Sequence, residues 1–90
     1  MVRLFIGKGG VSMSKIKKVR IENGYYLFKL EKLLSDNNIS INKLMKDTNT
    51  DYKVIKRLID GEVVRIDITV LARLCEYFDC EITDIFEYVR

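Results

Sequence analysis

Residues Ser40–Gly61, SINKLMKDTNTDYKVIKRLIDG, decide the fold that this chain of 90 residues can adopt. Apolar residues recur in this stretch at the spacing i, i+3, i+4, which places them on one face of a helix. The pattern occurs twice, first at Ile41, Leu44 and Met45 and then at Ile55, Leu58 and Ile59. The segment between them, Thr48-Asn49-Thr50, fits neither repeat. We therefore predict two short helices joined by a tight turn, the second over residues 51–60.

The residues at the ends of these helices support the prediction. Ser40 and Asp51 carry side-chain oxygens that can accept hydrogen bonds from the unpaired amide groups of a first helical turn. Asn49 tolerates the left-handed backbone conformation that a tight turn between helices needs. Gly61 is a typical residue at a helix end. Two helices at this spacing are a unit that proteins use to place a helix in the major groove of DNA.

Three more amphipathic segments surround this unit. The first runs from Tyr25 to Asp36, and another lies around Leu71–Phe78 with Asp67 as its N-cap. A last short helix is indicated by the spacing of Ile82, Ile85, Phe86 and Val89. Five short helices with brief connections predict an all-α fold, a bundle of five helices over residues 25–90 without a central sheet.

Residues 1–24 form a basic N-terminal arm with six Lys or Arg residues and one acid. Two structures are open for this arm: a flexible tail, or a short strand that includes Ile16, Val19 and Ile21. A strand would have no partner inside a helical bundle, so it would have to pair with the same strand of a second protomer or with another loop. The codons for Lys8-Gly9-Gly10 can contain a bacterial ribosome-binding sequence. This favours Met13 over Met1 as the natural start, with residues 1–12 as translated leader.

The composition points away from several classes of protein. The length is that of one domain, and a hydrophobic fraction of 48% is sufficient for a core. No apolar run approaches the roughly 20 residues of a membrane span, so we expect a cytoplasmic location and no membrane contact. Without histidine or clustered Cys, Asp and Glu, we expect no metal, no cofactor and no enzymatic activity. Cys75 and Cys80 fit small hydrophobic positions, with a redox role as the alternative.

The two-helix unit resembles the helix-turn-helix of phage lambda repressor/Cro-type regulators, also called the xenobiotic-response-element family. The resemblance is carried by Ser40, Leu44, Met45, Asn49, Thr50, Asp51, Ile55 and Gly61. It extends over residues 25–89, because the segment VLARLCEYFDCEITDIFEYV (70–89) is similar to the two helices that follow in this family. The resemblance implies a lambda-repressor-like fold. It also implies a sequence-specific transcriptional regulator that binds double-stranded DNA at a short palindrome as a homodimer.

By the same resemblance, one face of the second helix reads bases in the major groove through Tyr52, Lys53, Lys56 and Arg57. Arg57 can form two hydrogen bonds with one guanine, which is typically worth ~1–3 kcal/mol of discrimination. Contacts to the DNA backbone are expected from Asn42, Lys43, Arg65, Lys15, Lys17, Lys18 and Arg20. The cations of the arm would lie along the phosphates or enter the minor groove.

A second function stays open because the chain departs from the family pattern. Ile41 stands where the family has a glutamine that contacts phosphate, and Ile59 stands where it has an acid. Residues 25–90 carry ten cations and twelve acids, so the helical body is mildly acidic. The alternative is a protein-interaction module, or an antitoxin-like protein with weak or autoregulatory DNA binding. Its protein partner would bind an exposed apolar patch of Ile41, Ile59, Val63 and Val64.

Overall fold

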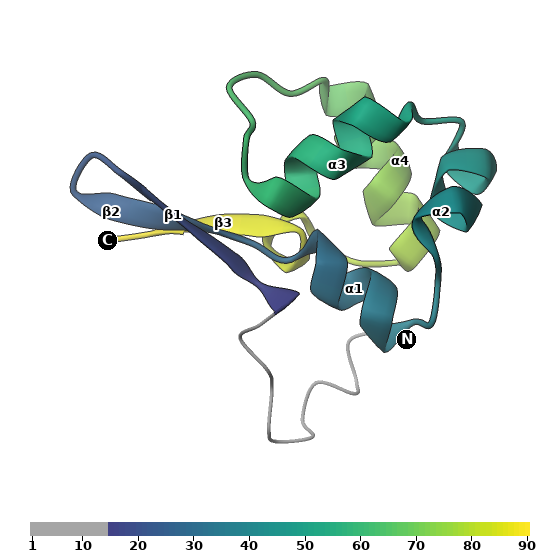
Figure 1. Cartoon of the computed structure of the whole chain (residues 1–90), viewed down its shortest axis with the longest axis horizontal. Helices are drawn as coiled ribbons and strands as arrows, with labels where there is room; N and C mark the ends of the chain where they lie inside the picture. The colour runs from purple at the N-terminus through teal and green to yellow at the C-terminus, as the bar shows by residue number, and fades with distance from the viewer. Residues whose placement is uncertain (1–14) are drawn as a thin grey trace.

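The computed structural model describes residues 15–90, and the expected leader, residues 1–12, lies outside this range. Within it, the α-helices are α1 (Leu30–Asp36), α2 (Ile41–Thr48), α3 (Tyr52–Asp60) and α4 (Ile68–Phe78). Three strands, β1 (Lys17–Ile21), β2 (Gly24–Phe28) and β3 (Phe86–Val89), form an antiparallel sheet in the order β1-β2-β3. A short 3-10 helix, η3 (Ile82–Asp84), precedes β3. The sheet extends to one side of the helices (Figure 1).

The all-α prediction is therefore wrong, and the first expected helix shows why. The helix expected over residues 25–36 begins only at Leu30, because residues 24–28 form β2. The sequence GYYLF is rich in aromatic residues, which favour strands. A two-residue turn at Glu22 and Asn23, with Glu22 at a φ of 57°, joins β2 to β1, so the two strands pair as an antiparallel hairpin.

The last expected helix is also wrong, since it is reduced to η3 and followed by β3. The spacing of Ile82, Ile85 and Val89 fits a helix, but Phe86 and Tyr88 equally fit the alternation of a strand. Runs this short do not distinguish the two by periodicity alone. Pairing with β2 decides the outcome, and it places Phe86 opposite Phe28.

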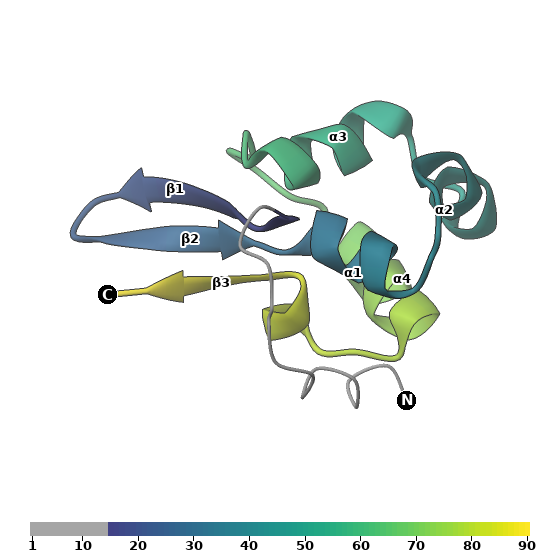
Figure 2. The same ribbon diagram turned by 60° about the horizontal axis from the view of Figure 1, so that its bottom comes forward.

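Of the two structures considered for the basic arm, residues 17–21 form the strand, β1, and its partner strand lies in the same chain. The expectation of a partner in a second protomer or another loop depended on a purely helical body. Because residues 24–28 are themselves a strand, β1 pairs with them from Lys17 opposite Phe28 to Ile21 opposite Gly24. Figure 2 shows the three strands beside the helices, with β1 on the same side of the molecule as α3.

The core lies between the helices and one face of the sheet. Side chains with no exposed surface are Leu30, Leu44, Ile55, Leu74 and Ile85. Strand side chains alternate between the two faces of a sheet. On one face, Tyr26, Phe28 and Phe86 belong to the core or pack against it, and the rings of Phe28 and Phe86 lie 5.8 Å apart. We call this the inner face of the sheet, and the opposite one the outer face.

Candidate nucleic-acid interface

The helix-turn-helix unit has the local geometry that the sequence predicts. The Ser40 hydroxyl accepts a hydrogen bond from the Lys43 amide at 3.1 Å, which confirms Ser40 as the N-cap of α2. Asn49 ends α2 in the left-handed conformation, with a φ of 52°, and Gly61 ends α3 with a φ of 74°. Asp51 takes the extended backbone of an N-cap, but its side chain makes no capping hydrogen bond. The unit is thus α2, a left-handed turn and α3.

Two buried hydroxyl groups fix the turn between α2 and α3. The Thr48 hydroxyl donates to the Leu44 carbonyl at 2.6 Å and lies 2.8 Å from the Thr50 hydroxyl. The Thr50 amide donates to the Met45 carbonyl at 3.1 Å, so the backbone of the turn is bonded to the last turn of α2. Buried polar groups cost free energy unless they are hydrogen-bonded. Satisfying them here holds the start of α3 in one position.

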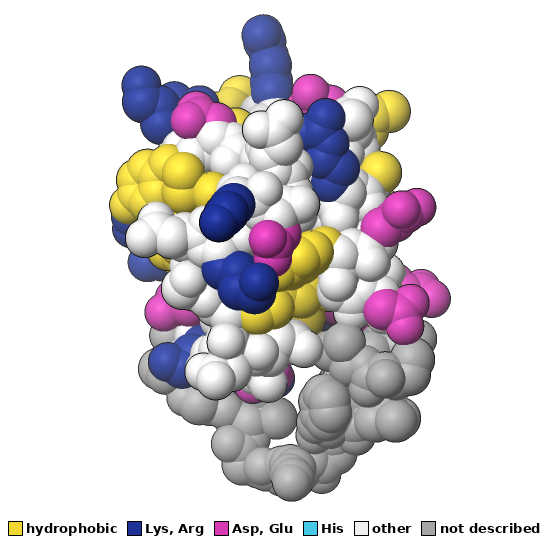
Figure 3. Space-filling view, turned by 90° about the vertical axis from the view of Figure 1, so that its right-hand side faces the viewer, with side chains coloured by type: hydrophobic (Ala, Val, Ile, Leu, Met, Phe, Trp, Pro, Cys, Tyr) yellow, Lys and Arg dark blue, Asp and Glu magenta, His cyan; other side chains and the backbone are white. Residues whose placement is uncertain are grey.

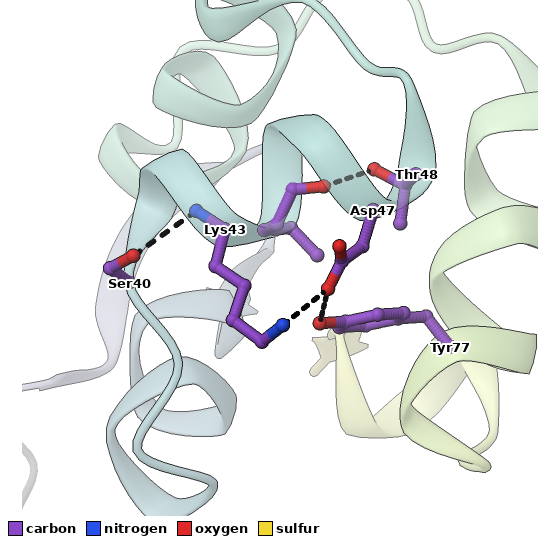
Figure 4. A network of polar contacts seen from close by, with 6 residues as sticks. Ser40, Lys43, Asp47, Thr48 and Tyr77 are labelled. Atoms are coloured by element: carbon purple, nitrogen blue, oxygen red, sulfur yellow. Dashed lines mark hydrogen bonds and ion pairs between the residues drawn. The ribbon is translucent and has the colours of Figure 1, made fainter.

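A polar network joins α2 to α4 behind the turn (Figure 4). The Tyr77 hydroxyl donates to the Asp47 carboxylate at 2.6 Å, and the Lys43 ammonium lies 2.9 Å from the same group. The hydrogen bond from Tyr77, with that from Lys43, holds the pKa of Asp47 below its ordinary value. The Asp47 carboxylate in turn raises the pKa of Lys43 and of Tyr77. Lys43, an expected backbone contact, is therefore already paired with an acid.

The exposed face of α3 carries all four residues predicted to read bases. Ile55, Leu58 and Ile59 are buried on the opposite side of the helix, whereas Tyr52 is 45% exposed. Lys53 and Arg57 are exposed and have no carboxylate within ion-pair distance among the described residues.

Lys56 differs from these two cations because it is paired. Its ammonium lies 3.1 Å from the Asp60 carboxylate one turn later, and this hydrogen bond raises the pKa of Lys56. Two unpaired cations and one paired cation thus share the solvent face of α3.

Two grooves flank α3 and gather other predicted contacts. A groove of about 770 Å³ between α3 and the loop before α4 is lined by Arg57 and Arg65, with Val54, Val63 and Val64 between them. A second, of about 420 Å³, is lined by Lys15 and Lys56 and by Ser40 at the start of α2. The structure therefore places Arg65 on the same groove as Arg57, and Lys15 on the same groove as Lys56.

The cations of β1 do not form one surface. Lys17 is on the inner face of the sheet, where its side chain lies beside Gly61 at the end of α3. Lys18 and Arg20 alternate with it and project from the outer face, where the Lys18 ammonium lies 4.3 Å from the centre of the Tyr25 ring. The expected backbone contacts by Lys17, Lys18 and Arg20 stay predictions, as does that by the exposed Asn42.

The apolar patch expected for a protein partner is only partly exposed. Ile59 is buried in the core, and Ile41 and Val63 are half-buried. Val64 is 95% exposed, and Ile68 at the start of α4, which sequence reasoning missed, is 78% exposed. Sequence reasoning also missed the contact between Asp47 and Tyr77. The two residues lie 30 positions apart, and no local pattern connects them.

The side of the molecule on which α2 lies has a mixed charge (Figure 3). Lys and Arg side chains are interspersed there with Asp and Glu and with small hydrophobic areas. Within residues 15–90, no group of three or more His, Cys, Asp or Glu residues can hold a metal ion. None of the helices in this range has both the length and the hydrophobicity of a membrane span. Burial raises the pKa of the half-buried Cys75 thiol, which disfavours the reactive thiolate.

Comparison with known families identifies the family to which this chain belongs. The family model of the Cro/C1-type HTH DNA-binding domain matches residues 29–90. The chain belongs to this family. The lambda repressor/Cro-type resemblance is thereby confirmed, and the Cro/C1-type HTH domain is a DNA-binding domain, so DNA is its partner at the level of the family. No curated protein and no solved structure matches the chain. The family match begins at Lys29, so β1 and β2 lie before the matched part of this Cro/C1-type chain.

Proposed function

We propose that this Cro/C1-type chain is a sequence-specific transcriptional regulator that inserts α3 into the major groove of DNA, acts in the cytoplasm and binds as a homodimer. The observation that supports the proposal is the solvent face of α3. Lys53 and Arg57 extend from it one turn apart without a carboxylate partner among the described residues, so neither has to break an ion pair to reach DNA. The bonded turn before α3 and the buried opposite face hold these two side chains on a rigid element.

The structure supports different roles for the four residues of this face. Arg57 fits a bidentate contact with guanine, and Lys53, closer to the start of the helix, fits a second base contact. Lys56 would have to exchange Asp60 for DNA, so it contributes less to affinity than its charge suggests. Tyr52, at the start of α3, fits packing against a sugar or a thymine methyl group.

Backbone contacts on both sides of α3 would fix its orientation in the groove. Arg65 borders the groove beside Arg57, and Lys15 borders the groove beside Lys56. In the proposed complex, these cations would meet phosphates on the two strands that border the major groove. Phosphate contacts position a protein on DNA, and base contacts provide specificity. Ser40 and Ile41 line the second groove and Asn42 follows them, exposed, in the first turn of α2, so a phosphate there would also meet the start of a helix.

The proposal is tested by selecting binding sites from a random duplex library with the purified protein. The expected result is a short palindromic consensus, bound about 10³-fold or more tightly than random DNA. Arg57→Ala should lose preference at one position of each half-site, at a cost of ~1–3 kcal/mol. Arg65→Ala should weaken binding to all sequences and reduce the salt slope by about one.

Arg73→Ala is the matched control for these variants. Arg73 is exposed on α4, where it borders a separate hollow with Asp47 and Tyr77, so its removal should leave the consensus and the salt slope unchanged. If selection enriches no sequence, or if Arg57→Ala leaves the consensus unchanged, the proposed use of α3 is wrong.

A second candidate function is a protein-interaction module or antitoxin-like protein, with DNA binding that is weak or autoregulatory. The observation that favours it is the exposure of two aliphatic side chains, Val64 in the loop before α4 and Ile68 at the start of α4. This candidate predicts weak DNA binding that salt abolishes. It also predicts that Val64→Lys removes partner binding and leaves the remaining DNA affinity intact.

A further inference from the structure

None of the residues of α3 or of its two flanking grooves that are assigned to DNA lies on the outer face of the sheet. Of the predicted DNA contacts, Lys18 and Arg20 do lie there, and the proposal below gives Lys18 a different role. Two register rows on this face contain the side chains of Lys18, Leu27 and Glu87 and of Arg20, Tyr25 and Val89. Within residues 15–90, the core cluster and the hydrophobic side chains packed on it include Val19, Tyr26 and Phe86 from the inner face. They do not include Tyr25, Leu27 or Val89, which are nevertheless half-buried. The outer face thus has an apolar centre, and no described residue packs on it.

One row across this face has an ordered charge pattern. Lys18 on β1 is opposite Leu27 on β2, and Leu27 is opposite Glu87 on β3. The row therefore reads cation, aliphatic side chain, anion from one edge of the sheet to the other. Lys18 is held above the sheet by its contact with the Tyr25 ring, at 4.3 Å. Glu87 lies 3.3 Å from Lys29, yet its side chain keeps 35% of its surface exposed.

Such a row is complementary to itself. Consider a two-fold axis that runs parallel to the strands, midway between two facing copies of the sheet. This axis places β1 of one copy over β3 of the other, and β2 over β2. Lys18 then faces Glu87 of the partner subunit, and Leu27 faces Leu27 of the partner subunit. Facing sheets pack about 10 Å apart, a distance that Lys and Glu side chains can span together.

We propose that the outer face of the sheet is the homodimer interface, with a second copy of this chain packed face to face on it. The charge pattern selects this occupant, because an acid at one edge disfavours phosphate, whereas the same chain supplies both signs in the required order. The inference rests on the homodimer of the proposed function and assigns its interface. It also gives β1 and β2, which precede the matched part of the family, a role in assembly.

Exchanging the two charges tests the proposed contact between Lys18 and Glu87 of the partner subunit. The mass of the protein is measured by light scattering and sedimentation, without DNA and over a range of protein concentrations. Wild type should be dimeric. Lys18→Glu and Glu87→Lys should each raise the dimer dissociation constant roughly tenfold to hundredfold, because like charges then face each other twice. The two single variants, mixed, should form a heterodimer of near wild-type affinity. The double variant, which restores one charge of each sign, should recover the homodimer.

Leu27→Asp tests the apolar centre, and Ile68→Asp is its matched control. Ile68 is an exposed aliphatic residue on α4, so the same substitution there should leave the dimer intact. Circular dichroism shows whether each variant folds. If Leu27→Asp does not fold, the charge variants still test the interface. A chain starting at Met13 is also measured, to test whether residues 1–12 affect dimerisation.

The outcomes separate this proposal from the proposed function. A monomeric wild type overturns the interface, as does a dimer that persists in both single charge variants or fails to return in their mixture. If only the chain that starts at Met13 dimerises, that chain is the wild type of this test, and its charge variants must break and restore the dimer in the same way. DNA selection reports independently on α3, so a protein that selects a palindrome but keeps its dimer in every variant retains the proposed function and loses only this interface.

Discussion

Replacing Gly61 by alanine tests how the sheet is held against the helix that is proposed to read DNA. Gly61 ends α3 with a φ of 74°, a conformation that costs a residue with a Cβ about 1 kcal/mol or more. A Cβ placed there would also lie 2.6 Å from Val19 Cγ2, 3.0 Å from Lys17 Cγ and 3.2 Å from Phe28 Cδ2. The lysine side chain can move, but Val19 is stiff because it is branched at Cβ. Overpacking of this kind typically costs ~1–3 kcal/mol, so the expected total is about 2–4 kcal/mol.

The assay is unfolding in urea followed by circular dichroism, with Asn49→Ala as the control. Asn49 has the same left-handed backbone, with a φ of 52°, but it is exposed at the turn. Its replacement should cost only the conformational part, about 1 kcal/mol. Adding Val19→Ala to Gly61→Ala should relieve the overlap, so the double variant should lose about 1 kcal/mol less than the sum of the single losses. Equal costs for Gly61→Ala and Asn49→Ala, or strict additivity with Val19→Ala, would refute the packing of β1 on the end of α3.

Three other measurements test single features of the site. Ser40→Ala should lower the free energy of unfolding by about 1 kcal/mol, and Asp51→Ala by clearly less, because only Ser40 makes a capping bond; equal losses in urea unfolding would contradict this. The depressed pKa of Asp47 means that its contribution to stability is present above the ordinary carboxylate pKa and is lost as the pH falls through the lower, folded pKa. Titration by NMR should show this depression, and Tyr77→Phe should reduce it; an unchanged pKa would exclude the hydrogen bond as its main cause. Asp60→Asn frees Lys56 from its ion pair and removes a negative charge near the exposed face of α3. Affinity for all duplex DNA should therefore rise severalfold in a binding titration at low salt. A fall in affinity would show that Asp60 itself takes part in binding.

The helix-turn-helix could be predicted from the sequence because its determinants are local. The repeated apolar spacing gave both helices, and Ser40, Asn49 and Gly61 defined their ends within a few residues of the chain. The N-cap of α4 was predictable for the same reason, since the Asp67 carboxylate accepts a hydrogen bond from the Thr69 amide two residues later. The exposed face of α3 then followed from the helical period alone.

The sheet could not be predicted because strand pairing depends on residues far apart in the sequence. The run that forms β2 also fits a helical stripe, and only its pairing with β1 and β3 decides between the two. The same limit applies to the site. That Lys15 borders the same groove as Lys56, and Arg65 the same groove as Arg57, depends on the path of loops whose sequences carry no periodic signal.

The two pairings of β2 have a consequence for the order in which this protein folds and opens. β1 and β2 are joined by a two-residue turn, and α2 and α3 by a short one, so both units can form early from local contacts. Phe28 meets Phe86 only about 60 residues later in the chain, so closing the sheet carries a larger entropic cost and comes late. By the same reasoning, hydrogen exchange should detect a native-state opening that releases β3 before it disturbs α2 and α3. The protein would then lose β3 from its sheet transiently, while the β1–β2 hairpin and the helix proposed to read DNA stay formed.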